Sequence, residues 1–355
     1  MEASTILVTG GAGFVGSNLC LAFREFWPET RIVALDNLRR RGSELNVPRL
    51  EAADVEFVRG DVRRSEDLQF EDLDLIVECS AEPSVLAGRD GGTDYVVHTN
   101  LLGTYNCLEL CRRTGAGMVF LSTSRVYPMG ALGGLPLKPA ESRFVLPDGY
   151  SAQGVSEIGI AESFPLDGAR SLYGATKLSS ELLITEYVEM FDLPIVVNRC
   201  GVLTGPWQMG KVDQGVVVLW MARHIFGGKL DYIGYGGDGK QVRDILHVQD
   251  LADLLKLQID SLCKHKGKTY NVGGGPGISV SLQELTDLCR EISGKTIEIG
   301  SVPGNRAGDV PWYVTDSTRV REATGWSPQH GVEEILRDVH QWICENREEL
   351  KPILG

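Results

Sequence analysis

The feature that most constrains the fold is a glycine-rich stretch that directly follows a short apolar run near the start of the chain. The apolar run is Ile6-Leu7-Val8, and residues 9–16 read Thr-Gly-Gly-Ala-Gly-Phe-Val-Gly. Glycines spaced three apart between a strand and a helix are typical of the first βα turn of a dinucleotide-binding fold. Gly10 allows the tight turn, Gly13 lets backbone approach a pyrophosphate, and Gly16 lets the helix pack closely on the strand. The stretch therefore predicts a dinucleotide site at a helix N-terminus.

A second apolar run ends in an acidic residue where such folds hold a ribose. Ile32-Val33-Ala34-Leu35 is followed by Asp36, twenty residues after Gly16. A carboxylate at this place accepts hydrogen bonds from the ribose of NAD and repels the 2′-phosphate of NADP. The basic run Arg39-Arg40-Arg41 offers the alternative of a 2′-phosphate site. We expect NAD, because Asp36 would repel that phosphate.

Strand-like and helix-like patterns alternate along the first part of the chain. Further strands are expected at 55–58, 73–78, 118–121 and 194–199, and helices at about 93–114 and from Leu172 onward. This alternation predicts an α/β fold, a Rossmann-type doubly wound parallel sheet with helices on both faces. Ligands of such sheets bind beyond the carboxyl ends of the strands, where Asp61, Ala81 and Ser122-Thr123 fall.

The remaining sequence is more mixed and predicts a second part. We expect residues 1–200 to form the NAD-binding Rossmann domain, with 242–275 returning to its sheet. Residues 201–241 and 276–355 are then expected to form a smaller, mixed α/β substrate-binding lobe. The stretch 127–171 lacks a regular pattern, and a loop of that length inside a compact domain is usually functional.

Composition excludes several classes of function. The formal net charge of -13 argues against a nucleic-acid partner, which usually needs a basic face. No apolar stretch reaches the ~20 residues of a membrane span, and no signal-like segment precedes the first strand. The eight cysteines include no Cys-x-x-Cys pair, and the histidine spacing suggests no metal site. We therefore expect a soluble, cytoplasmic protein with free thiols and no metal.

Tyr173 and Lys177 lie four residues apart, on one face of a predicted helix. A free tyrosine, with a pKa of ~10, is a poor base near pH 7, and a neighbouring ammonium favours its phenolate. A surface Tyr/Lys pair is the ordinary alternative. The upstream dinucleotide turn and the cluster Ser122-Thr123-Ser124 at a strand end favour a catalytic pair, with a hydroxyl of the cluster holding the reacting group against Tyr173.

At this point the chain resembles the extended short-chain dehydrogenase/reductase family, which contains nucleotide-sugar epimerases and dehydratases. The resemblance covers essentially the whole chain. The motifs that carry it are the glycine turn, Asp36-Asn37-Leu38, Gly60-Asp61-Val62, Ser122-Thr123-Ser124-Arg125-Val126-Tyr127, Tyr173 with Lys177, and Arg243-Asp244-Ile245-Leu246-His247-Val248. It implies that Thr123, Tyr173 and Lys177 are the catalytic residues.

The resemblance also implies the binding residues. The cofactor contacts would come from Gly10, Gly13, Phe14, Val15, Gly16, Asp36, Asn37, Arg39, Asp61, Val62, Ala81, Asn100, Tyr173 and Lys177. The substrate contacts would come from Ser124, Arg125, Asp213, Gln214, Arg243 and Arg306. Among these, Arg243 and Arg306 would bind a pyrophosphate, because a planar guanidinium meets two oxygens at once.

The family contains enzymes of different reaction type. In 4,6-dehydratases an acidic residue directly follows the catalytic threonine, whereas here Ser124-Arg125 follows. The segments 36–42, 212–216 and 239–244 are similar to CDP-paratose 2-epimerases, although Leu172 and Leu203-Thr204 depart from that pattern. The resemblance therefore implies an NAD-dependent isomerase, a homodimer that acts on a nucleotide-diphosphate sugar. The alternatives are a UDP-sugar 4-epimerase, a net reductase, and a non-catalytic NAD-binding sensor or scaffold.

Overall fold

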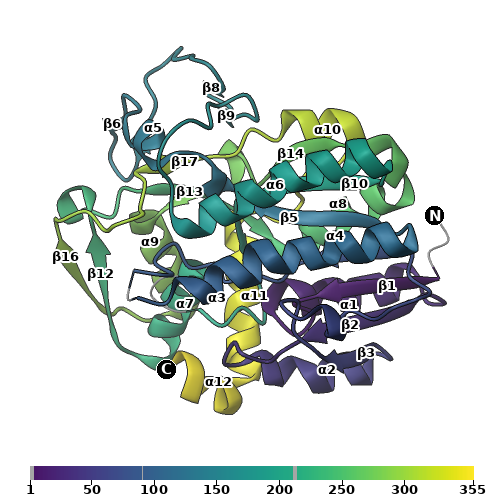
Figure 1. The fold of residues 1–355 in the computed structure, drawn as a ribbon. Coiled ribbons are helices and arrows are strands. Elements are labelled where there is room, and N and C mark those ends of the chain that lie inside the picture. The colour runs from purple at the N-terminus through teal and green to yellow at the C-terminus, as the bar shows by residue number, and fades with distance from the viewer. Residues whose placement is uncertain (1–3, 90, 211–213) are drawn as a thin grey trace.

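The structure is a computed structural model that describes residues 4–89, 91–210 and 214–355 (Figure 1). Within these residues, seven parallel strands form one sheet. Its order is β14 (Lys268–Val272), β10 (Ile195–Cys200), β5 (Gly117–Thr123), β4 (Leu75–Glu78), β1 (Thr5–Thr9), β2 (Arg31–Asp36) and β3 (Glu56–Arg59). The central strands are buried along their whole length, because helices cover both faces of the sheet.

The helices that cover the sheet form two layers. One layer contains α1 (Phe14–Phe26), α2 (Val47–Ala52), α8 (Val248–Asp260) and α10 (Thr318–Thr324). The other contains α3 (Thr93–Val97), a π-helical turn (His98–Leu102), α4 (Gly103–Thr114) and α6 (Leu172–Phe191). Figure 1 shows α4 and α6 running side by side across the front of the sheet. The predicted Rossmann-type doubly wound fold is therefore confirmed.

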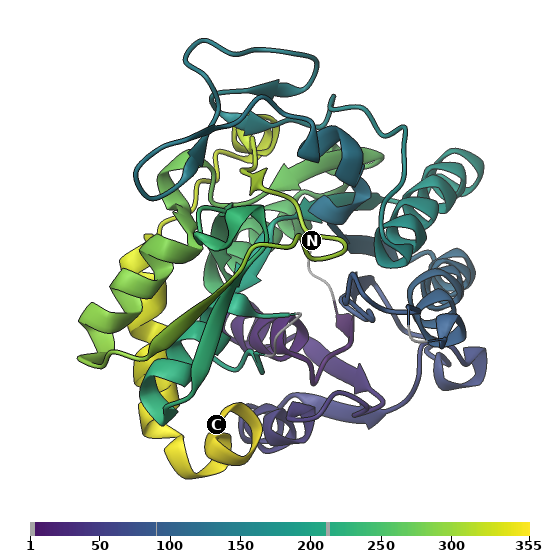
Figure 2. The same cartoon turned by 90° about the vertical axis from the view of Figure 1, so that its left-hand side faces the viewer.

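A smaller lobe lies beside the sheet (Figure 2). Its strands are β11 (Val202–Thr204), β13 (Val242–His247), β15 (Ser279–Ser281) and β17 (Trp312–Tyr313), with a separate ribbon of β12 (Lys229–Ile233) and β16 (Glu298–Val302). Its helices are α7 (Val216–Phe226), α9 (Leu282–Ser293), α11 (Val332–Glu345) and α12 (Arg347–Leu354). These helices enclose an apolar core of their own, around Trp220, Leu285 and Ile335.

The return of 242–275 to the main sheet needs a correction. Only the last strand of this segment, β14, pairs with β10 in the main sheet. The first strand, β13, pairs instead with β11, β15 and β17, while α8 between them packs on α1. We keep the division into a Rossmann domain and a substrate lobe as a proposal, which the separate core of the smaller lobe supports.

The irregular stretch 127–171 contains short elements that sit above the sheet's carboxyl edge (Figure 1). They are α5 (Met129–Gly133) and two hairpins, β6 (Lys138–Pro139) with β7 (Phe144–Val145) and β8 (Val155–Ser156) with β9 (Gly159–Ile160). Ile160 donates its backbone N–H to the carbonyl of Val314 at 2.7 Å, which ties this stretch to the smaller lobe.

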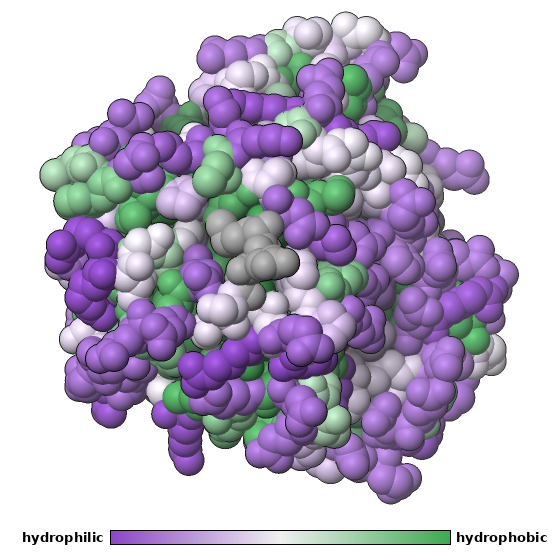
Figure 3. Space-filling view, turned by 90° about the vertical axis from the view of Figure 1, so that its right-hand side faces the viewer, coloured by the Kyte–Doolittle hydropathy of each residue, from purple (hydrophilic) through white to green (hydrophobic). Residues whose placement is uncertain are grey.

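No helix in the described ranges is long and apolar enough to cross a membrane. The face drawn in Figure 3 is largely hydrophilic, with small, separate hydrophobic patches.

Candidate active site

The glycine-rich turn forms a cradle between β1 and α1. Gly10 has a φ of +64°, in the left-handed region that favours glycine. A Cβ atom on Gly16 would lie 2.2 Å from the Gly10 carbonyl oxygen, so the helix packs against the turn only without a side chain there. Phe14 and Val15 open the helix after Gly13, which provides no side-chain cap. The first amides of α1 therefore suit a phosphate group, and the turn fits a dinucleotide.

Asp36 ends β2 beside this cradle. Its carboxylate accepts hydrogen bonds from the backbone N–H groups of Leu38, at 2.7 Å, and Ala12, at 3.2 Å. Burial raises the pKa of Asp36, and these amides oppose the rise. The carboxylate thus ties the glycine turn to the loop after β2, in the place where a ribose carboxylate is expected.

A polar cluster stands at the ends of β2 and β3. Asn37 donates to Asp61 at 3.1 Å, and Arg63 forms an ion pair with Asp61 at 2.6 Å. Burial opposes ionisation of Asp61, but its bonds to Arg63 and Asn37 hold its pKa at about 2. The guanidinium of Arg39 lies 3.8 Å from the ring centroid of Tyr95. Arg39 therefore stacks on Tyr95, and Asp61 is a fixed anion at the carboxyl ends of β2 and β3.

The other two arginines of the basic run have protein partners. Arg41 donates to the carbonyl of Pro352 at 2.6 Å, and Arg40 donates to the carbonyl of Met209 at 3.1 Å. Arg40 also donates to the side chain of Gln214. These contacts direct the two guanidinium groups toward the smaller lobe, which favours NAD over NADP.

Gln214 bridges two loops of the Rossmann domain. Its carbonyl oxygen accepts from Arg40, after β2, and its amide nitrogen donates to Glu82, after β4, at 3.4 Å. The sequence predicts that Gln214 contacts the sugar, and we propose instead that it links the loops after β2 and β4. Its neighbour Asp213, also predicted to bind substrate, lies outside the described residues.

The three predicted catalytic residues come together at the end of β5. Thr123 is the last residue of that strand. Tyr173, in the first turn of α6, bonds the Thr123 side chain, and Lys177, one turn later, lies over the ring of Phe120 on β5. The helix begins there because the hydroxyl of Ser171 accepts the N–H of Gly174 at 3.1 Å. Burial raises the pKa of Tyr173, whereas Lys177 and a hydrogen bond with the Thr123 side chain lower it. Burial and the neighbouring groups therefore act in opposite directions on the pKa of this phenol.

Three further predicted cofactor residues lie after β3, after β4 and in the π-helical turn before α4. Asn100 is fully buried, accepts the N–H of Glu82 at 2.8 Å and donates to the hydroxyl of Thr176 at 3.1 Å. We propose that Asn100 positions the loop after β4 against α6 instead of contacting the cofactor. Val62 follows β3, where its carbonyl accepts from Asn106 at 2.8 Å. Ala81 lies half-buried in the loop after β4.

Arginines gather on the substrate side. Arg125 follows Thr123 and Ser124 in a short 3₁₀ turn and donates to the carbonyl of Gly308 at 3.0 Å. Arg243, on β13, forms an ion pair with Asp309 at 2.7 Å. Burial and the nearby Arg243 lower the pKa of Arg125 to about 10. Two guanidinium groups close enough to repel one another favour the binding of an anion between them.

Arg306 lies in the same loop as Asp309, whose backbone N–H donates to the Arg306 carbonyl at 3.3 Å. The same loop contains Gly308, whose carbonyl accepts from Arg125, and Asp309, the partner of Arg243. We propose that the loop 303–309 adds Arg306 to these two arginines in a pyrophosphate site.

Sequence reasoning missed two residues of the site. Tyr235, between β12 and β13, has a pKa raised to about 12 by burial and by Asp309, while Arg243 and Arg125 oppose the rise. It therefore borders the arginine cluster. Glu78 is the fully buried last residue of β4, and its carboxylate lies 3.2 Å from the Nζ atom of Lys177. The sequence offers one indication of a role for Glu78, namely that an acidic residue ends an otherwise apolar strand.

A buried ion pair lies directly behind the catalytic residues. Glu181, two turns after Tyr173 on α6, accepts three hydrogen bonds from Arg199 of β10, two at 3.1 Å and one at 2.7 Å. The Ser122 hydroxyl donates to the same carboxylate, and the guanidinium donates to the Tyr127 hydroxyl at 3.2 Å. This pair fixes α6 against β5 and β10, and so fixes Tyr173 against Thr123.

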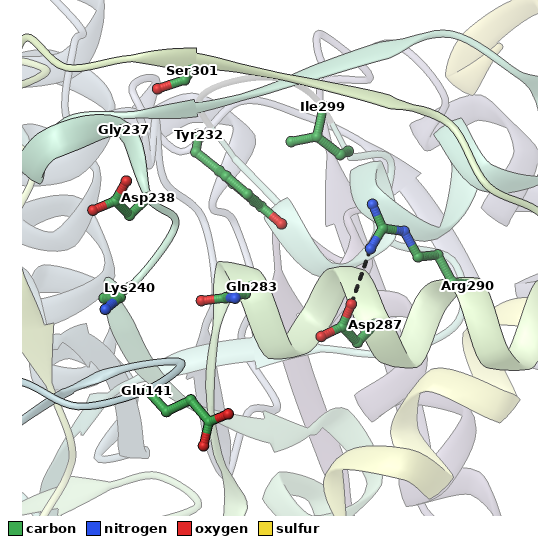
Figure 4. A pocket seen from close by; sticks show the side chains of 10 residues that line it. All are labelled: Glu141, Tyr232, Gly237, Asp238, Lys240, Gln283, Asp287, Arg290, Ile299 and Ser301. Carbon is green, nitrogen blue, oxygen red and sulfur yellow. Dashed lines mark hydrogen bonds and ion pairs between the residues drawn. The ribbon is translucent and has the colours of Figure 1, made fainter.

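A hollow on the surface lies away from these residues, in the smaller lobe (Figure 4). It has a volume of about 540 Å³ and lies between β12, β16 and the start of α9. Three of its charged groups have protein partners: Arg290 pairs with Asp287 at 3.0 Å, and Lys240 donates to the Ala140 carbonyl at 2.8 Å. The residues that line the hollow do not include those predicted for the site, and we do not assign the chemistry to it.

Comparison with known proteins identifies what this arrangement is similar to. The model of the NAD dependent epimerase/dehydratase family matches residues 6–273. CDP-paratose 2-epimerase of Salmonella typhi is 29% identical over 352 residues, which cover 95% of this chain and 98% of that protein.

Solved structures of nucleotide-sugar epimerases and dehydratases are also similar to this chain. UDP-glucose 4-epimerase of Thermus thermophilus, in complex with NAD, is similar with a TM-score of 0.74 and 28% identity, covering 96% of this chain and 99% of that one. A dTDP-glucose 4,6-dehydratase double mutant from Streptomyces venezuelae, with NAD bound, has a TM-score of 0.79 and 26% identity, covering 98% and 99%. The similarity therefore extends through both lobes.

Proposed function

The chain belongs to the NAD dependent epimerase/dehydratase family, and we propose that within it this enzyme is an epimerase of a nucleotide-diphosphate sugar. The observation that carries the proposal is the residue that follows Thr123. Ser124 and Arg125 come directly after Thr123 in a short 3₁₀ turn, whereas the dehydratases resembled here need an acid directly after the threonine.

The side chains have separate tasks in this reaction. Bound NAD supplies the chemistry of accepting a hydride from a sugar carbon and returning it to the opposite face. Tyr173 takes the proton of the sugar hydroxyl and gives it back. Thr123 holds that hydroxyl by a hydrogen bond, and Lys177 favours the phenolate form of Tyr173. Because the proton and the hydride are both returned, the enzyme needs no second redox substrate.

The arginine cluster supports a pyrophosphate anchor. We propose that Arg125, Arg243 and Arg306 hold the two phosphates of the substrate while the oxidised sugar rotates to present its other face. Arg243 would exchange its contact with Asp309 for phosphate oxygens, a change that a bidentate guanidinium makes readily. Tyr235 borders this cluster and would contact the nucleoside.

For the sugar, we propose inversion at C2, as in a CDP-paratose 2-epimerase. The support is the segments 36–42, 212–216 and 239–244 together with the 29% identity to the Salmonella enzyme. The second candidate is a UDP-sugar 4-epimerase, which the similarity to the Thermus structure favours. Both reactions use the same three catalytic residues, so substrate-side residues decide between them.

Labelled substrates test this proposal. Purified enzyme is first assayed by NMR with CDP-, UDP- and GDP-sugars, and an accepted sugar is then prepared with deuterium at C2 or at C4. We expect a primary isotope effect with label at C2 and none with label at C4. The reverse result identifies a 4-epimerase. Tight binding of NAD with no turnover of any sugar would favour a sensor or scaffold.

Replacing Asp36 by alanine is expected to weaken NAD binding and to reduce discrimination against NADP. The carboxylate holds the loop after β2 to the glycine turn and would repel a 2′-phosphate. Dissociation constants for both cofactors, measured by calorimetry, check this. Asp36→Asn is the matched variant, since it keeps the oxygen acceptor and loses only the charge. Unchanged affinities in both variants would remove Asp36 from the ribose site.

We also propose a homodimer that forms through α4 and α6. Large apolar side chains are exposed on this face, namely Leu102, Tyr105, Leu182, Met190 and Phe191. We expect light scattering to show a dimer at micromolar concentration, and Leu182→Glu, at a 64% exposed position, to yield a monomer. Ile158→Glu, at an exposed position in the turn between β8 and β9, is the control and leaves the dimer intact. A monomeric wild-type protein would contradict the proposal.

A cytoplasmic location belongs to the same proposal. All eight cysteines lie in described segments and carry free thiols, which is the usual state in a reducing compartment.

A further inference from the structure

The catalytic lysine has a buried acidic partner in a neighbouring strand. Glu78 ends β4 and is fully buried, and the side chain of Lys177 is only 2% exposed. The Lys177 Nζ atom lies 3.2 Å from Oε2 of Glu78 and 4.2 Å from the ring centroid of Phe120, on β5. The ammonium group therefore sits between two strands of the sheet, with an aromatic ring on one side and a carboxylate on the other.

The other titratable groups around this pair carry no charge near neutral pH. They are buried thiols, and burial raises the pKa of each of them: Cys79 after β4, Cys107 on α4 and Cys200 on β10. Burial likewise raises the pKa of Tyr173, on α6. Arg125, beyond Tyr173, adds a second positive charge. Burial also raises the pKa of Glu78, and Lys177 opposes that rise. Glu78 is the carboxyl group that faces Lys177 in the described part of the site.

An ammonium in such surroundings needs a counter-charge. Removal from water disfavours the charged form of a lysine by up to about 3–5 pH units for a fully buried group, and a nearby opposite charge restores it by about 1–3 units. Lys177 favours the phenolate of Tyr173 only while it is charged. A negative charge on Glu78 would therefore favour the phenolate of Tyr173 indirectly, by keeping Lys177 charged.

We propose that Glu78 is a positioning residue, the buried counter-ion that keeps Lys177 protonated and fixed beneath Tyr173. This inference rests on the proposed function, since it concerns the same catalytic pair. Glu78 thus joins Thr123, Tyr173 and Lys177 as a fourth residue of the proposed catalytic group. It lies on β4, which pairs with β5, the strand that carries Thr123. Glu78 contacts Lys177 and acts on the reacting groups only through it.

The first test measures Lys177 directly, without turnover. Full-length protein with ¹³C-labelled lysine is titrated by NMR, and the Lys177 signal is assigned with a Lys177→Arg variant. In Glu78→Gln, which keeps an oxygen acceptor but removes the charge, we expect Lys177 to lose its proton at a pH lower than in wild type by at least about one unit. Glu78→Asp, which restores the charge, returns the titration toward wild type.

The second test is the pH dependence of kcat/KM. A discharged Lys177 no longer favours the phenolate, so the pKa of Tyr173 rises, and the acid limb of the profile moves to higher pH in Glu78→Gln. Activity at neutral pH falls and is recovered in alkaline buffer. Glu56→Gln, which removes an exposed charge paired with Arg31 on β2, is the control and leaves the profile unchanged.

Two results would overturn the proposal. A profile and a Lys177 titration equal to those of wild type, with only a lower melting temperature, would make Glu78 a structural residue. A shift of the acid limb to lower pH would mean that Glu78 merely offsets the charge of Lys177. Failure of the proposed epimerase function is distinguishable, because it leaves the wild type inactive on every sugar nucleotide while the NMR titrations still differ.

Discussion

Tyr173→Phe is expected to lower turnover by about 10²–10⁴-fold, the range that general acid–base catalysis typically contributes. The variant keeps the aromatic ring that packs at the end of β5 and removes only the hydroxyl that bonds Thr123. The glycine turn and Asp36 remain intact, so the amount of NAD that copurifies with the protein should stay at the wild-type level. Activity on the accepted sugar nucleotide and the absorbance of released cofactor measure the two quantities.

Tyr105→Phe, at a 42% exposed position on α4, is the matched control. It keeps the aromatic ring of the proposed dimer face and removes only a hydroxyl, so it should retain wild-type activity within about twofold. If Tyr173→Phe also remained within twofold of wild type, Tyr173 would not be the base. Loss of both activity and bound NAD would instead show that the substitution disturbs the cofactor cleft. Only loss of activity with retention of NAD agrees with the assigned role.

The second large effect is expected from the ion pair behind the site. Arg199→Met leaves the carboxylate of Glu181 buried and without its counter-charge, with both side chains less than 10% exposed. Breaking a buried pair in this way costs about 3–5 kcal/mol, because the remaining charge has lost the solvation that the pair replaced. We expect a clear fall in the urea midpoint of unfolding, together with lower activity, since α6 loses its anchor on β10.

Two further variants define what this result means. In the double variant Arg199→Met with Glu181→Gln neither position of this pair carries a charge, and we expect most of the lost stability to return. Arg31→Met breaks an ion pair with Glu56 whose members are 51% and 45% exposed, and should change stability by no more than about 1 kcal/mol. A fall of less than about 1 kcal/mol in Arg199→Met would contradict the assigned role of the pair.

The parts of the site that the sequence predicted depend on local spacing. Gly10, Gly13 and Gly16 lie within one βα turn, and a turn that tight admits few residue types. Tyr173 and Lys177 share a helix face because four residues span about one turn. Asp36 and Thr123 each follow an apolar run that predicts a strand, so the sequence also placed them at the carboxyl edge of a parallel sheet. In each case covalent geometry determines the relation between the residues.

Other features depend on which segments come together, and only the tertiary structure decided them. The run at 242–247 reads like a strand of the main sheet, yet it pairs with β11, β15 and β17, because strand pairing is chosen among distant segments. Glu78 and Lys177 are 99 positions apart, and Gln214 reaches Arg40 across 174. The electrostatic effect of a carboxylate depends on the charge packed against it and on the removal of water from both groups. The sequence by itself thus determined the Rossmann sheet and predicted Thr123, Tyr173 and Lys177 as the catalytic trio, whereas packing determined that Glu78 lies against Lys177.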